Sequence, residues 1–500
     1  MGSIGVLIIL ILAGVLVLVA MHDLSQKRHA ILRNFPIIGH FRYLLEKLGP
    51  ELRQYIVADN DEERPFNRDQ RRWVYATAKK ENPYFGFGTD NDVDLPGSIV
   101  IKHSTFPAAT AAKNNSLPSA KVLGAWGNRP KAFRPNSLVN ISGMSFGSLS
   151  GPAIEALNKG SLRAGCLHNT GEGGISSYHR NGGDLVYQIG TGLFGSRDLE
   201  GNFSMDALLE TISETPVKAI EVKLSQGAKP GIGGVLPAKK VTNEIATTRG
   251  VPKGVMVQSP AKHTSFDDVT GLIEFVELIA AQTGIPVGIK AAVGQIHFWV
   301  ELADQMEASR RGPDFISIDG AEGGTGAAPL VFSDSVAYPF RIGFAKVFDI
   351  FYTRSLHRDI TFIGAGKLGY PDTALAAFAL GCDIVNVGRE AMMAIGCIQA
   401  QRCHTGHCPT GVATQSPWLA RGLDPTDKSV RVANYMVALQ HEIRRLCHAV
   451  GVTHPALIPE SAIEIINQEG SPISLLNYYG LSSIEQRLDE TDSNYLASIP

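Results

Sequence analysis

The sequence predicts an α/β fold, a (β/α)8 TIM barrel with an N-terminal transmembrane helix and helical flanking segments. Three observations lead to this prediction. Short apolar strands alternate with helical segments from about residue 135 onward, the strands end in glycine-rich or polar loops, and the chain opens on an uncharged apolar run. Strands that alternate with helices indicate a parallel sheet, and eight such units within about 260 residues suit a closed barrel. A doubly wound sheet is the structural alternative.

Residues 1–25 are the predicted membrane anchor. From Met1 to Met21 the chain carries no charged side chain and is apolar almost without a break. About eighteen such residues, at 1.5 Å each, span about 27 Å, which is near the hydrocarbon thickness of a bilayer. A cleaved signal peptide would carry a basic residue before the apolar run and small residues at its end, and this run has neither. A buried core helix is the remaining alternative.

The basic residues that follow this run give the expected orientation. Lys27, Arg28 and Arg33 come directly after the apolar segment, and the positive-inside rule then places the rest of the chain in the cytoplasm. We therefore expect a single-pass membrane protein with a cytoplasmic catalytic body. In that reducing compartment, clustered cysteines bind metal or do redox work more often than they form disulfides.

The composition gives no sign of a nucleic-acid partner. The chain has 500 residues, with 46 Lys and Arg against 48 Asp and Glu, and no basic tract interleaved with aromatic residues. Its 52 glycines cluster in loops that flank strands, which suits close approach of the backbone to a ligand. The expected domains are the anchor (1–25), a helical or irregular lead-in docked by Trp73 and Tyr75 (26–130), the barrel (131–440) and a helical cap (441–500).

The barrel elements are expected in a regular order. The strands should lie within residues 138–147, 167–174, 185–190, 219–227, 285–294, 314–324, 360–369 and 383–390. Helices are expected between several of them, over 151–165, 206–214, 267–284, 299–312 and 371–381. In a barrel the carboxyl ends of all strands meet on one face, where active sites are built. The polar loops that end these strands should therefore converge.

The loop after the seventh strand contains a glycine motif. Gly364 to Gly369 spells G-x-G-x-x-G, and Asp383 follows at about the distance that a dinucleotide fold requires. That acid should close a strand, however, whereas Asp383 opens one, and too little chain remains for a nucleotide domain. We therefore predict a barrel phosphate site, in which Gly364 and Gly366 offer backbone N–H groups and Arg389 offers charge. A glycine turn without ligand is the alternative.

Charged and amide side chains are expected at other strand ends. Lys290 lies inside an apolar strand, where a lysine is costly unless it is paired with negative charge. Its partner could be a structural carboxylate, an electron-rich cofactor or an anionic substrate. Gln226 and Lys229 add an amide and a second cation, and Glu172 is a possible acid/base group. Glycines in the segment 319–329 would let its backbone approach a flat or anionic ligand.

Three cysteines, Cys397, Cys403 and Cys408, fall within twelve positions. Their spacing is not that of a zinc ribbon, although His404 and His407 could complete a zinc site. Three thiols with a proline after the last favour an iron–sulfur cluster. Unligated core cysteines are the third alternative. The remaining cysteines are isolated in apolar or helical settings and are expected to be buried thiols: Cys166, Cys382 and Cys447.

Several motifs together resemble one known family. "SGMSFG", "NTGEGG", "QGAKPG", "GGTGA", "GAGK" and "GCI…CHTGHCPTGVATQ" occur in this order. As a set they resemble the FMN-binding synthase domain of glutamate synthases, in a stand-alone, membrane-anchored form, over roughly residues 80–440. The resemblance implies a barrel that holds FMN and a 3Fe–4S cluster in segment 396–410, with Cys397, Cys403 and Cys408 as the cluster ligands.

The resemblance also implies site residues. Glu172 and Lys229 would face 2-oxoglutarate, and Lys290 would act both in catalysis and beside the flavin. The implied FMN-binding residues are Ser142, Gly143, Met144, Ser145, Gln226, Lys290, Gly323, Gly324, Gly364, Gly366, Gly388 and Arg389. The chain departs from the family at Ile232, where a glutamate is typical, and at Arg389, where a threonine is usual.

The implied activity is reductive amination of 2-oxoglutarate to glutamate, with ammonia or another amine donor and hydride from reduced FMN. Electrons would come from a donor such as ferredoxin or a reductase subunit. The chain shows no glutaminase domain, so a separate glutaminase subunit is a further expected partner. Two alternatives remain: a membrane-linked FMN and iron–sulfur oxidoreductase acting on another keto or hydroxy acid, and a non-catalytic electron-transfer subunit. Glu172, Lys229 and Lys290 argue against a catalytically silent barrel.

Overall fold

The computed structural model describes residues 2–26, 30–57, 61–108, 116–481, 484 and 487–498. The chain divides into two compact units, Met1–Arg71 and Arg72–Pro500. Lys27 and Arg28, two of the three basic residues on which the expected membrane orientation rests, lie outside the described residues. The finer boundaries expected at residues 25, 130 and 440 stay predictions.

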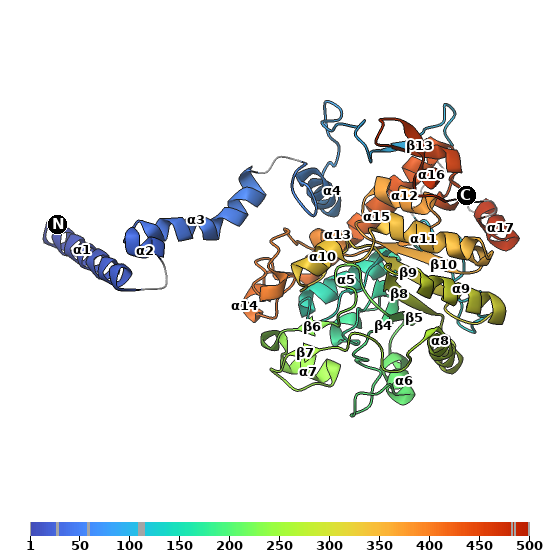
Figure 1. The fold of residues 1–500 in the computed structure, drawn as a ribbon, viewed down its shortest axis with the longest axis horizontal. Helices are drawn as coiled ribbons and strands as arrows, with labels where there is room; N and C mark the ends of the chain where they lie inside the picture. Colours follow the sequence, from blue (N-terminus) through green and yellow to red (C-terminus); the bar gives the residue numbers. More distant parts are fainter. Residues whose placement is uncertain are drawn as a thin grey trace. The chain divides into compact units, whose positions relative to one another are not determined.

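The second unit contains a closed barrel of eight parallel strands, as the sequence predicts (Figure 1). Each strand pairs with its neighbours in chain order, and the last closes on the first through Val385 and Val139. The barrel strands are β2 (Val139–Ile141), β3 (His168–Asn169), β4 (Leu185–Ile189), β5 (Val217–Lys223), β8 (Val287–Ala292), β9 (Phe315–Asp319), β10 (Thr361–Ala365) and β11 (Ile384–Val387). Seven of them lie within the expected ranges, and β5 begins two residues before its expected range of 219–227.

Helices surround the barrel. The helices between or after the strands are α5 (Gly151–Ala164), α6 (Met205–Ser213), α8 (Val269–Thr283), α9 (His297–Ser309), α10 (Leu330–Ser335), α11 (Phe340–Tyr352), α12 (Pro371–Ala379) and α13 (Arg389–Ala394). Local signals fix their ends. In α5 the Ser150 hydroxyl accepts from the Ala153 amide, and Gly165 ends the helix at φ 66°. A later helix, α15 (Pro425–Val450), packs against α5 and α12.

An insertion between β5 and α8 extends the loop that follows the fourth barrel strand. It holds β6 (Val235–Leu236), a 3-10 turn (Ala238–Lys240), α7 (Asn243–Arg249) and β7 (Val257–Gln258), with β6 and β7 paired antiparallel. The segment after α13 contains a short 3-10 turn (Cys403–Thr405) and α14 (Pro417–Ala420). These two segments bring residues to the active-site face that no barrel strand carries.

The strands are shorter than the apolar runs of the sequence. β2 ends at Ile141 and β3 at Asn169, so the glycine-rich remainders of both runs are loops. The run after β3 turns at Gly171, which has φ 66°, and the run after β2 turns further on, at Gly147, which has φ 103°. Such angles lie outside the β region and end a strand.

The C-terminal cap is not wholly helical, and this expectation is corrected. β12 (Ile463–Ile466) and β13 (Pro472–Ser474) form an antiparallel hairpin, and β1 (Ile99–Ile101) of the lead-in adds a third strand. The apolar alternation of residues 463–466 is a strand signal. Two short helices complete the cap, α16 (Leu475–Tyr478) and α17 (Glu490–Ser498). The lead-in and the cap are thus joined by one small sheet, although their strands lie far apart in the sequence.

The expected docking of the lead-in is confirmed within the second unit. Helix α4 (Arg68–Lys79) carries Trp73, whose ring lies 5.9 Å from the rings of both Tyr370 and Tyr435. Tyr75 donates a 2.8 Å hydrogen bond to the carbonyl of Cys397. Trp73 therefore packs α4 against the rings of Tyr370 and Tyr435, and Tyr75 ties it to the segment that contains the clustered cysteines.

The first unit consists mainly of helices: α1 (Gly2–Ser25), α2 (Ala30–Asn34), α3 (Gly39–Leu52) and a π-helical turn (Arg53–Val57). One helix among the described residues, over Ile4–Ser25, is long and apolar enough to cross a membrane by length and composition. The buried Asp23 carboxylate links α1 to α3, because it accepts from the Ile37 amide at 3.0 Å and contacts His40 Nε2 at 2.9 Å.

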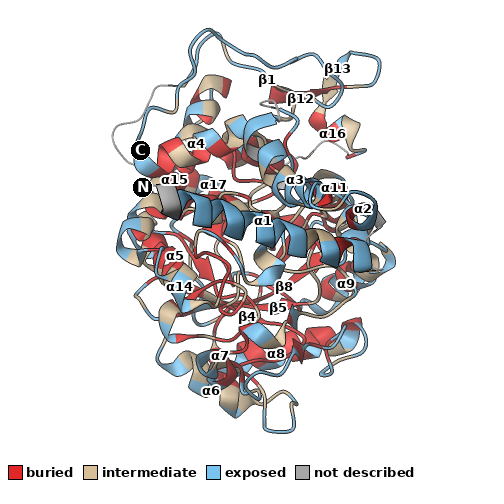
Figure 2. Cartoon of the chain, turned by 90° about the vertical axis from the view of Figure 1, so that its left-hand side faces the viewer, coloured by how far each residue is buried: buried red, intermediate tan, exposed pale blue. Residues whose placement is uncertain are grey.

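The barrel interior is layered. The end of the barrel at which the strands begin, here called its lower end, is filled by an apolar cluster of Leu123, Ala219, Phe315, Ile363 and Ile384. Figure 2 shows the strands β4, β5 and β8 as mostly buried. Above the apolar layer the inward side chains become polar and then charged, whereas barrel interiors are ordinarily filled by branched apolar residues. The polar layer thus carries a cost that stability alone does not explain.

Buried histidines predict acid lability. Burial lowers the pKa of His168 to about 3 and the pKa values of His263 and His454 to about 4. An unfolded histidine titrates near 6.5, so below that pH the unfolded chain binds protons that the folded chain does not. The free energy of unfolding should fall from pH 6.5 toward pH 4, by about 1.4 kcal/mol per pH unit for each histidine.

Urea unfolding of the full chain at pH 7 and pH 5 measures this loss. His454→Gln is the diagnostic variant, because it removes one titrating ring and should make the pH dependence shallower. An equal pH dependence in the variant and the parent would contradict the assignment of His454.

Candidate active site

The loops after β2 and β11 meet at the barrel mouth, as expected. The Ser142 amide donates a 2.9 Å hydrogen bond to the Val387 carbonyl. A β-carbon at Gly388 would lie 3.6 Å from that of Ser142. The four predicted residues 142–145 are all half-buried. They therefore line a rim rather than a closed core.

The loop after β3 supports this rim from below. A β-carbon at Gly143 would lie 2.7 Å from Asn169 Oδ1, and one at Gly171 would lie 2.5 Å from the backbone nitrogen of Ser145. Side chains are excluded at both positions, since real β-carbons do not approach atoms so closely. Glycine at these positions is required by the packing of the two loops.

Lys290 has a carboxylate partner. Its ammonium lies 3.2 Å from Asp319 at the end of β9, and the lysine is 6% exposed. Burial alone would lower the pKa of Lys290, but the carboxylates of Asp319 and Glu221 outweigh burial and raise it. Lys290 is therefore a fixed positive charge at neutral pH. A carboxylate partner, one of the three alternatives that the sequence leaves open, is present at the barrel mouth.

Glu172 lies among cations. Its carboxylate is 3.1 Å from the Lys223 ammonium, which also donates to Gln226 Oε1 at 2.5 Å. Burial would raise the pKa of Glu172, but Lys223, Lys229 and Arg249 together lower it. A β-carbon at Gly234 would lie 2.6 Å from Glu172 Oε1, so the carboxyl group is held closely by backbone.

The loop after β9 connects two further predicted residues. Gln226 Nε2 donates to Thr325 Oγ1 at 3.1 Å, and Lys229 Nζ donates to the Ala327 carbonyl at 3.0 Å. Burial lowers the pKa of Lys229, although Glu172 opposes this effect. Gln226, Lys229 and Glu172 thus share one region of the mouth, as the sequence predicts.

The predicted phosphate residues are only partly brought together. Arg389 donates to the Glu322 carbonyl, and a β-carbon at Gly324 would lie 2.5 Å from Arg389 Cδ, so Gly323, Gly324 and Arg389 are neighbours. By contrast, a β-carbon at Gly364 would lie 2.6 Å from the ring of Phe340. Gly364 is therefore required by packing, which is what a glycine turn without ligand would require.

Asp383 lies at the opposite end of the strands from this loop. Its carboxylate contacts Lys121 at 2.9 Å and accepts from the Phe362 amide at 2.8 Å. It thus pairs with a buried lysine near the start of β10 and β11. The rejection of a dinucleotide motif is consistent with this placement.

Four important residues were not predicted. Asp319 and Lys223 are charged residues at the ends of apolar strands, and the charges themselves were a usable signal. Glu221 alternates with Lys223 along the same strand, so both point inward. Arg249 comes from α7 of the insertion, donates to the Phe146 carbonyl at 2.9 Å and has a pKa lowered by burial to about 10. Nothing in the local sequence distinguishes Arg249 from a surface arginine.

The three clustered cysteines are close in sequence but do not form one ligand group. Among the described residues, no group of three or more Cys, His, Asp or Glu side chains is placed to hold a metal. Cys403 and Cys408 share the neighbouring Lys240, which donates to the Cys403 carbonyl at 2.8 Å. His404 and His407 are exposed. As placed in the structure, the three thiols are not drawn together into one ligand group.

The other three cysteines are buried free thiols, as predicted. Burial raises the pKa of Cys166 and that of Cys447 to about 12, and it raises that of Cys382 further. Such thiols stay protonated and unreactive at neutral pH.

A closed parallel barrel thus gathers charged side chains at its mouth: Glu172, Lys223, Lys229, Arg249 and Lys290. The chain matches the conserved region in glutamate synthase over residues 120–453. It is 36% identical over 492 residues to the glutamate synthase large subunit-like protein YerD of Bacillus subtilis, covering 91% of this chain and 93% of the relative. The chain belongs to the glutamate synthase family of oxidoreductases.

More distant similarities were also found. An archaeal glutamate synthase (NADPH) of Methanocaldococcus jannaschii is 36% identical over 315 residues, covering 63% of this chain and 59% of the relative's length. A mandelate oxidase structure with 2-hydroxy-phenylacetamide is 15% identical, with TM-score 0.42, covering 77% of this chain and 86% of that chain. A flavocytochrome b2 structure with pyruvate bound is 14% identical, with TM-score 0.44, covering 94% and 93%.

The mouth residues fit a flavin mononucleotide chemically. Lys290 and the Gln226 amide are donors of the kind that a flavin's polar edge accepts, and Arg389 beside Gly323, Gly324 and Gly388 suits a phosphate. At Gly388 the surroundings are open enough that a β-carbon would meet only Ser142 within 4 Å. The donor set therefore matches the group that the sequence implies.

Proposed function

We propose that the chain catalyses reductive amination of 2-oxoglutarate to glutamate, using FMN and ammonia or another amine donor. Membership of the glutamate synthase family supports the reaction class. The observation that carries the proposal is the cluster of charges at the mouth, where Lys223, Lys229 and Arg249 surround Glu172. A dicarboxylate needs such cations, and a silent barrel would have no reason to bury them.

The side chains divide the work by charge. Lys229 and Arg249 would bind the carboxylates of the substrate, a role supported by their position near Glu172, whose closest ion pair is with Lys223. Glu172 is ionised at neutral pH, because its pKa lies below the usual range. It can hold an ammonium ion or take a proton from the attacking amine.

FMN bound at the mouth would supply the hydride. Lys290 and Gln226 would hold its polar edge, Ser142 to Ser145 would lie against its ring, and Gly323, Gly324, Gly366, Gly388 and Arg389 would hold its phosphate. Positive charge from Lys290 favours the negative charge that FMN gains on reduction.

We further propose that Cys397, Cys403 and Cys408 hold a 3Fe–4S cluster. Their spacing and the shared Lys240 beside Cys403 and Cys408 support this assignment. Binding would require the segment 396–410 to draw its thiols together. An external donor such as ferredoxin or a reductase subunit would supply electrons, and a separate glutaminase subunit could supply ammonia.

The direct test uses the purified full chain in detergent. We expect a flavin absorbance spectrum and formation of glutamate from 2-oxoglutarate and ammonium with a reduced dye as donor. A colourless protein would refute the FMN assignment. Flavin without glutamate formation would favour another keto or hydroxy acid as substrate.

We also propose that the first unit attaches the enzyme to a membrane. All of α1 from Ile4 is exposed apart from its C-terminal turns, and its length suits a single span. One face of α3 is apolar and exposed as well, with Phe41, Leu44, Leu45, Leu48 and Leu52. The opposite face carries the 2.6 Å ion pair of Arg42 and Glu46. Such a helix, linked to α1 through Asp23, suits the membrane surface.

Deleting residues 2–25 should release most of the protein from the membrane fraction, measured by centrifugation and immunoblotting. The double substitution Leu44→Glu and Leu48→Glu in the deleted chain should release what remains. Arg42→Gln, on the polar face of α3, serves as the matched control and should change the distribution little. An unchanged membrane fraction after deletion would contradict the anchor.

A further inference from the structure

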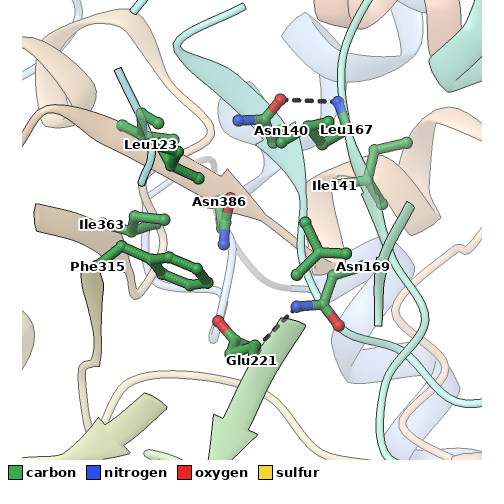
Figure 3. Close-up of a pocket in the computed structure, with 11 residues that line it drawn as sticks. Leu123, Asn140, Ile141, Leu167, Asn169, Glu221, Phe315, Ile363 and Asn386 are labelled. Atoms are coloured by element: carbon green, nitrogen blue, oxygen red, sulfur yellow. Dashed lines mark hydrogen bonds between the residues drawn. The ribbon is translucent and has the colours of Figure 1, made fainter. Parts of the chain in front are cut away.

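A buried carboxylate lies in the polar layer below the mouth. Glu221 is 1% exposed, and it points from β5 into the barrel. Glu221 lines a cavity of about 10 Å³, which is enough for a single water molecule. Asn140, Asn169 and Asn386 line the same cavity (Figure 3). Burying a charge there is costly unless hydrogen bonds hold it.

Glu221 is held by three donors. Its Oε2 accepts from Asn169 Nδ2 at 2.8 Å and from Gln188 Nε2 at 2.6 Å, and its Oε1 accepts from Ser317 Oγ at 2.7 Å. Figure 3 shows the contact between Asn169 and Glu221. These donors come from three different strands, β3, β4 and β9. The carboxylate thus orients both amides toward one point inside the barrel.

Those two amides support the rim of the mouth. Asn169 Oδ1 accepts from the Gly171 amide at 2.9 Å. A β-carbon at Gly143 would lie 2.7 Å from Asn169 Oδ1 and 3.0 Å from Gln188 Nε2, so the backbone of Gly143 lies directly against both. If the Asn169 amide were turned around, it would lose its bond to Gly171. Glu221 therefore determines how the Asn169 and Gln188 side chains are oriented, and the 142–145 loop lies against these two side chains.

Glu221 also lies near Lys290. On the paired strands β5 and β8, Glu221 is opposite Gly288 and Lys223 is opposite Lys290, so Glu221 lies one inward layer below the lysine pair. Lys290 therefore has Asp319 at 3.2 Å and Glu221 in the layer below, and the Glu172 carboxylate also acts on it. All three carboxylates reduce the positive field that Lys290 presents at the mouth.

We infer that Glu221 is a positioning residue that orients Asn169 and Gln188 under the 142–145 loop and sets, through Lys290, the reduction potential of the bound flavin. The inference rests on the proposed function only in that FMN occupies the mouth. It does not depend on the identity of the substrate.

Glu221→Gln separates the two effects. A glutamine can keep all three hydrogen bonds, because its Oε1 can accept from both amides while its Nε2 donates to Ser317 Oγ. The substitution removes only the negative charge. Glu221→Asp does the reverse, since it keeps the charge but is too short to keep all three bonds.

The first measurement is the FMN midpoint potential of the full-chain holoenzyme. Glu221→Gln should raise this potential by at least ~30 mV, which for two electrons is a tenfold change in the ratio of reduced to oxidised flavin. Glu221→Asp should leave the potential near the parent value and weaken FMN binding. Glu277→Gln is the charge control, because Glu277 pairs with Arg129 at the other end of the strands, and it should change neither quantity. A potential unchanged in Glu221→Gln would overturn the inference.

The second measurement needs no cofactor. In the FMN-free full chain, Lys290→Met leaves Glu221 and Asp319 without their cation, so it should lower the urea midpoint of unfolding. Adding Glu221→Gln should restore part of that loss, whereas in the parent background it should lower the midpoint or leave it unchanged. Equal effects of Glu221→Gln in both backgrounds would overturn the coupling with Lys290. A parent protein that contains no flavin would refute the proposed function. The double-mutant cycle of Lys290→Met and Glu221→Gln would still test the coupling between the two residues.

Discussion

Lys290→Met should lower kcat/KM for glutamate formation by about 100-fold or more, which corresponds to about 2.7 kcal/mol of transition-state stabilisation. The substitution removes a buried positive charge that lies 3.2 Å from Asp319. Asp319 would then lose its ion-pair partner, and the negative charge that FMN gains on reduction would be opposed. Steady-state rates with reduced dye, 2-oxoglutarate and ammonium measure the loss.

Lys218→Met is the matched control for this result. Lys218 lies on the same strand as Glu221 but is about half exposed, at 46%, and forms only a 3.9 Å surface contact with Asp184. Its removal should change the rate less than twofold, because surface ion pairs contribute little. A rate for Lys290→Met within a factor of two of the parent would refute a role for Lys290 in the reaction.

Cys403→Ser should remove most of the iron and acid-labile sulfide from the purified protein while leaving FMN bound. A serine hydroxyl is a poor ligand for iron compared with a thiolate, and a cluster with three cysteine ligands tolerates the loss of one badly. The quantities to measure are iron per FMN and the broad visible absorbance of the cluster. We expect the parent to contain close to three iron atoms per FMN, as the 3Fe–4S assignment requires.

Cys447→Ala provides the control for this variant. Cys447 is fully buried in α15, and burial raises its pKa to about 12, so it is not placed to ligate iron. Its iron content should equal that of the parent. Iron unchanged in Cys403→Ser would refute the cluster assignment, and zinc in place of iron in the parent would favour the alternative in which His404 and His407 contribute.

Several residues of the candidate site can be predicted from the sequence because they lie in or just after an apolar strand. A charge or amide after an apolar run indicates Glu172, Gln226 and Lys229, and a parallel barrel gathers all such ends on one face. The lysine in "VGIKAAVG" was informative because burial of an unpaired charge is costly.

Other residues required the tertiary structure. Arg249 reaches the mouth from an insertion, and its contact with the Phe146 carbonyl joins positions about one hundred residues apart. The cap strands β12 and β13 were missed because they are short, and their partner β1 lies more than 350 residues earlier in the chain. Short-range patterns carry no information about partners at such separations.

The sequence by itself determined the barrel, its strand order and the presence of charged groups at the strand ends, because periodicity and the position of glycines are local properties. Only the tertiary structure decided which charges are paired. Asp319 is the ion-pair partner of Lys290, Glu172 lies among Lys223, Lys229 and Arg249, and Glu221 is buried beneath them. The pairing depends on the register between strands and on the path of the insertion. Both are set by packing across the whole barrel, so no single segment of the sequence contains them.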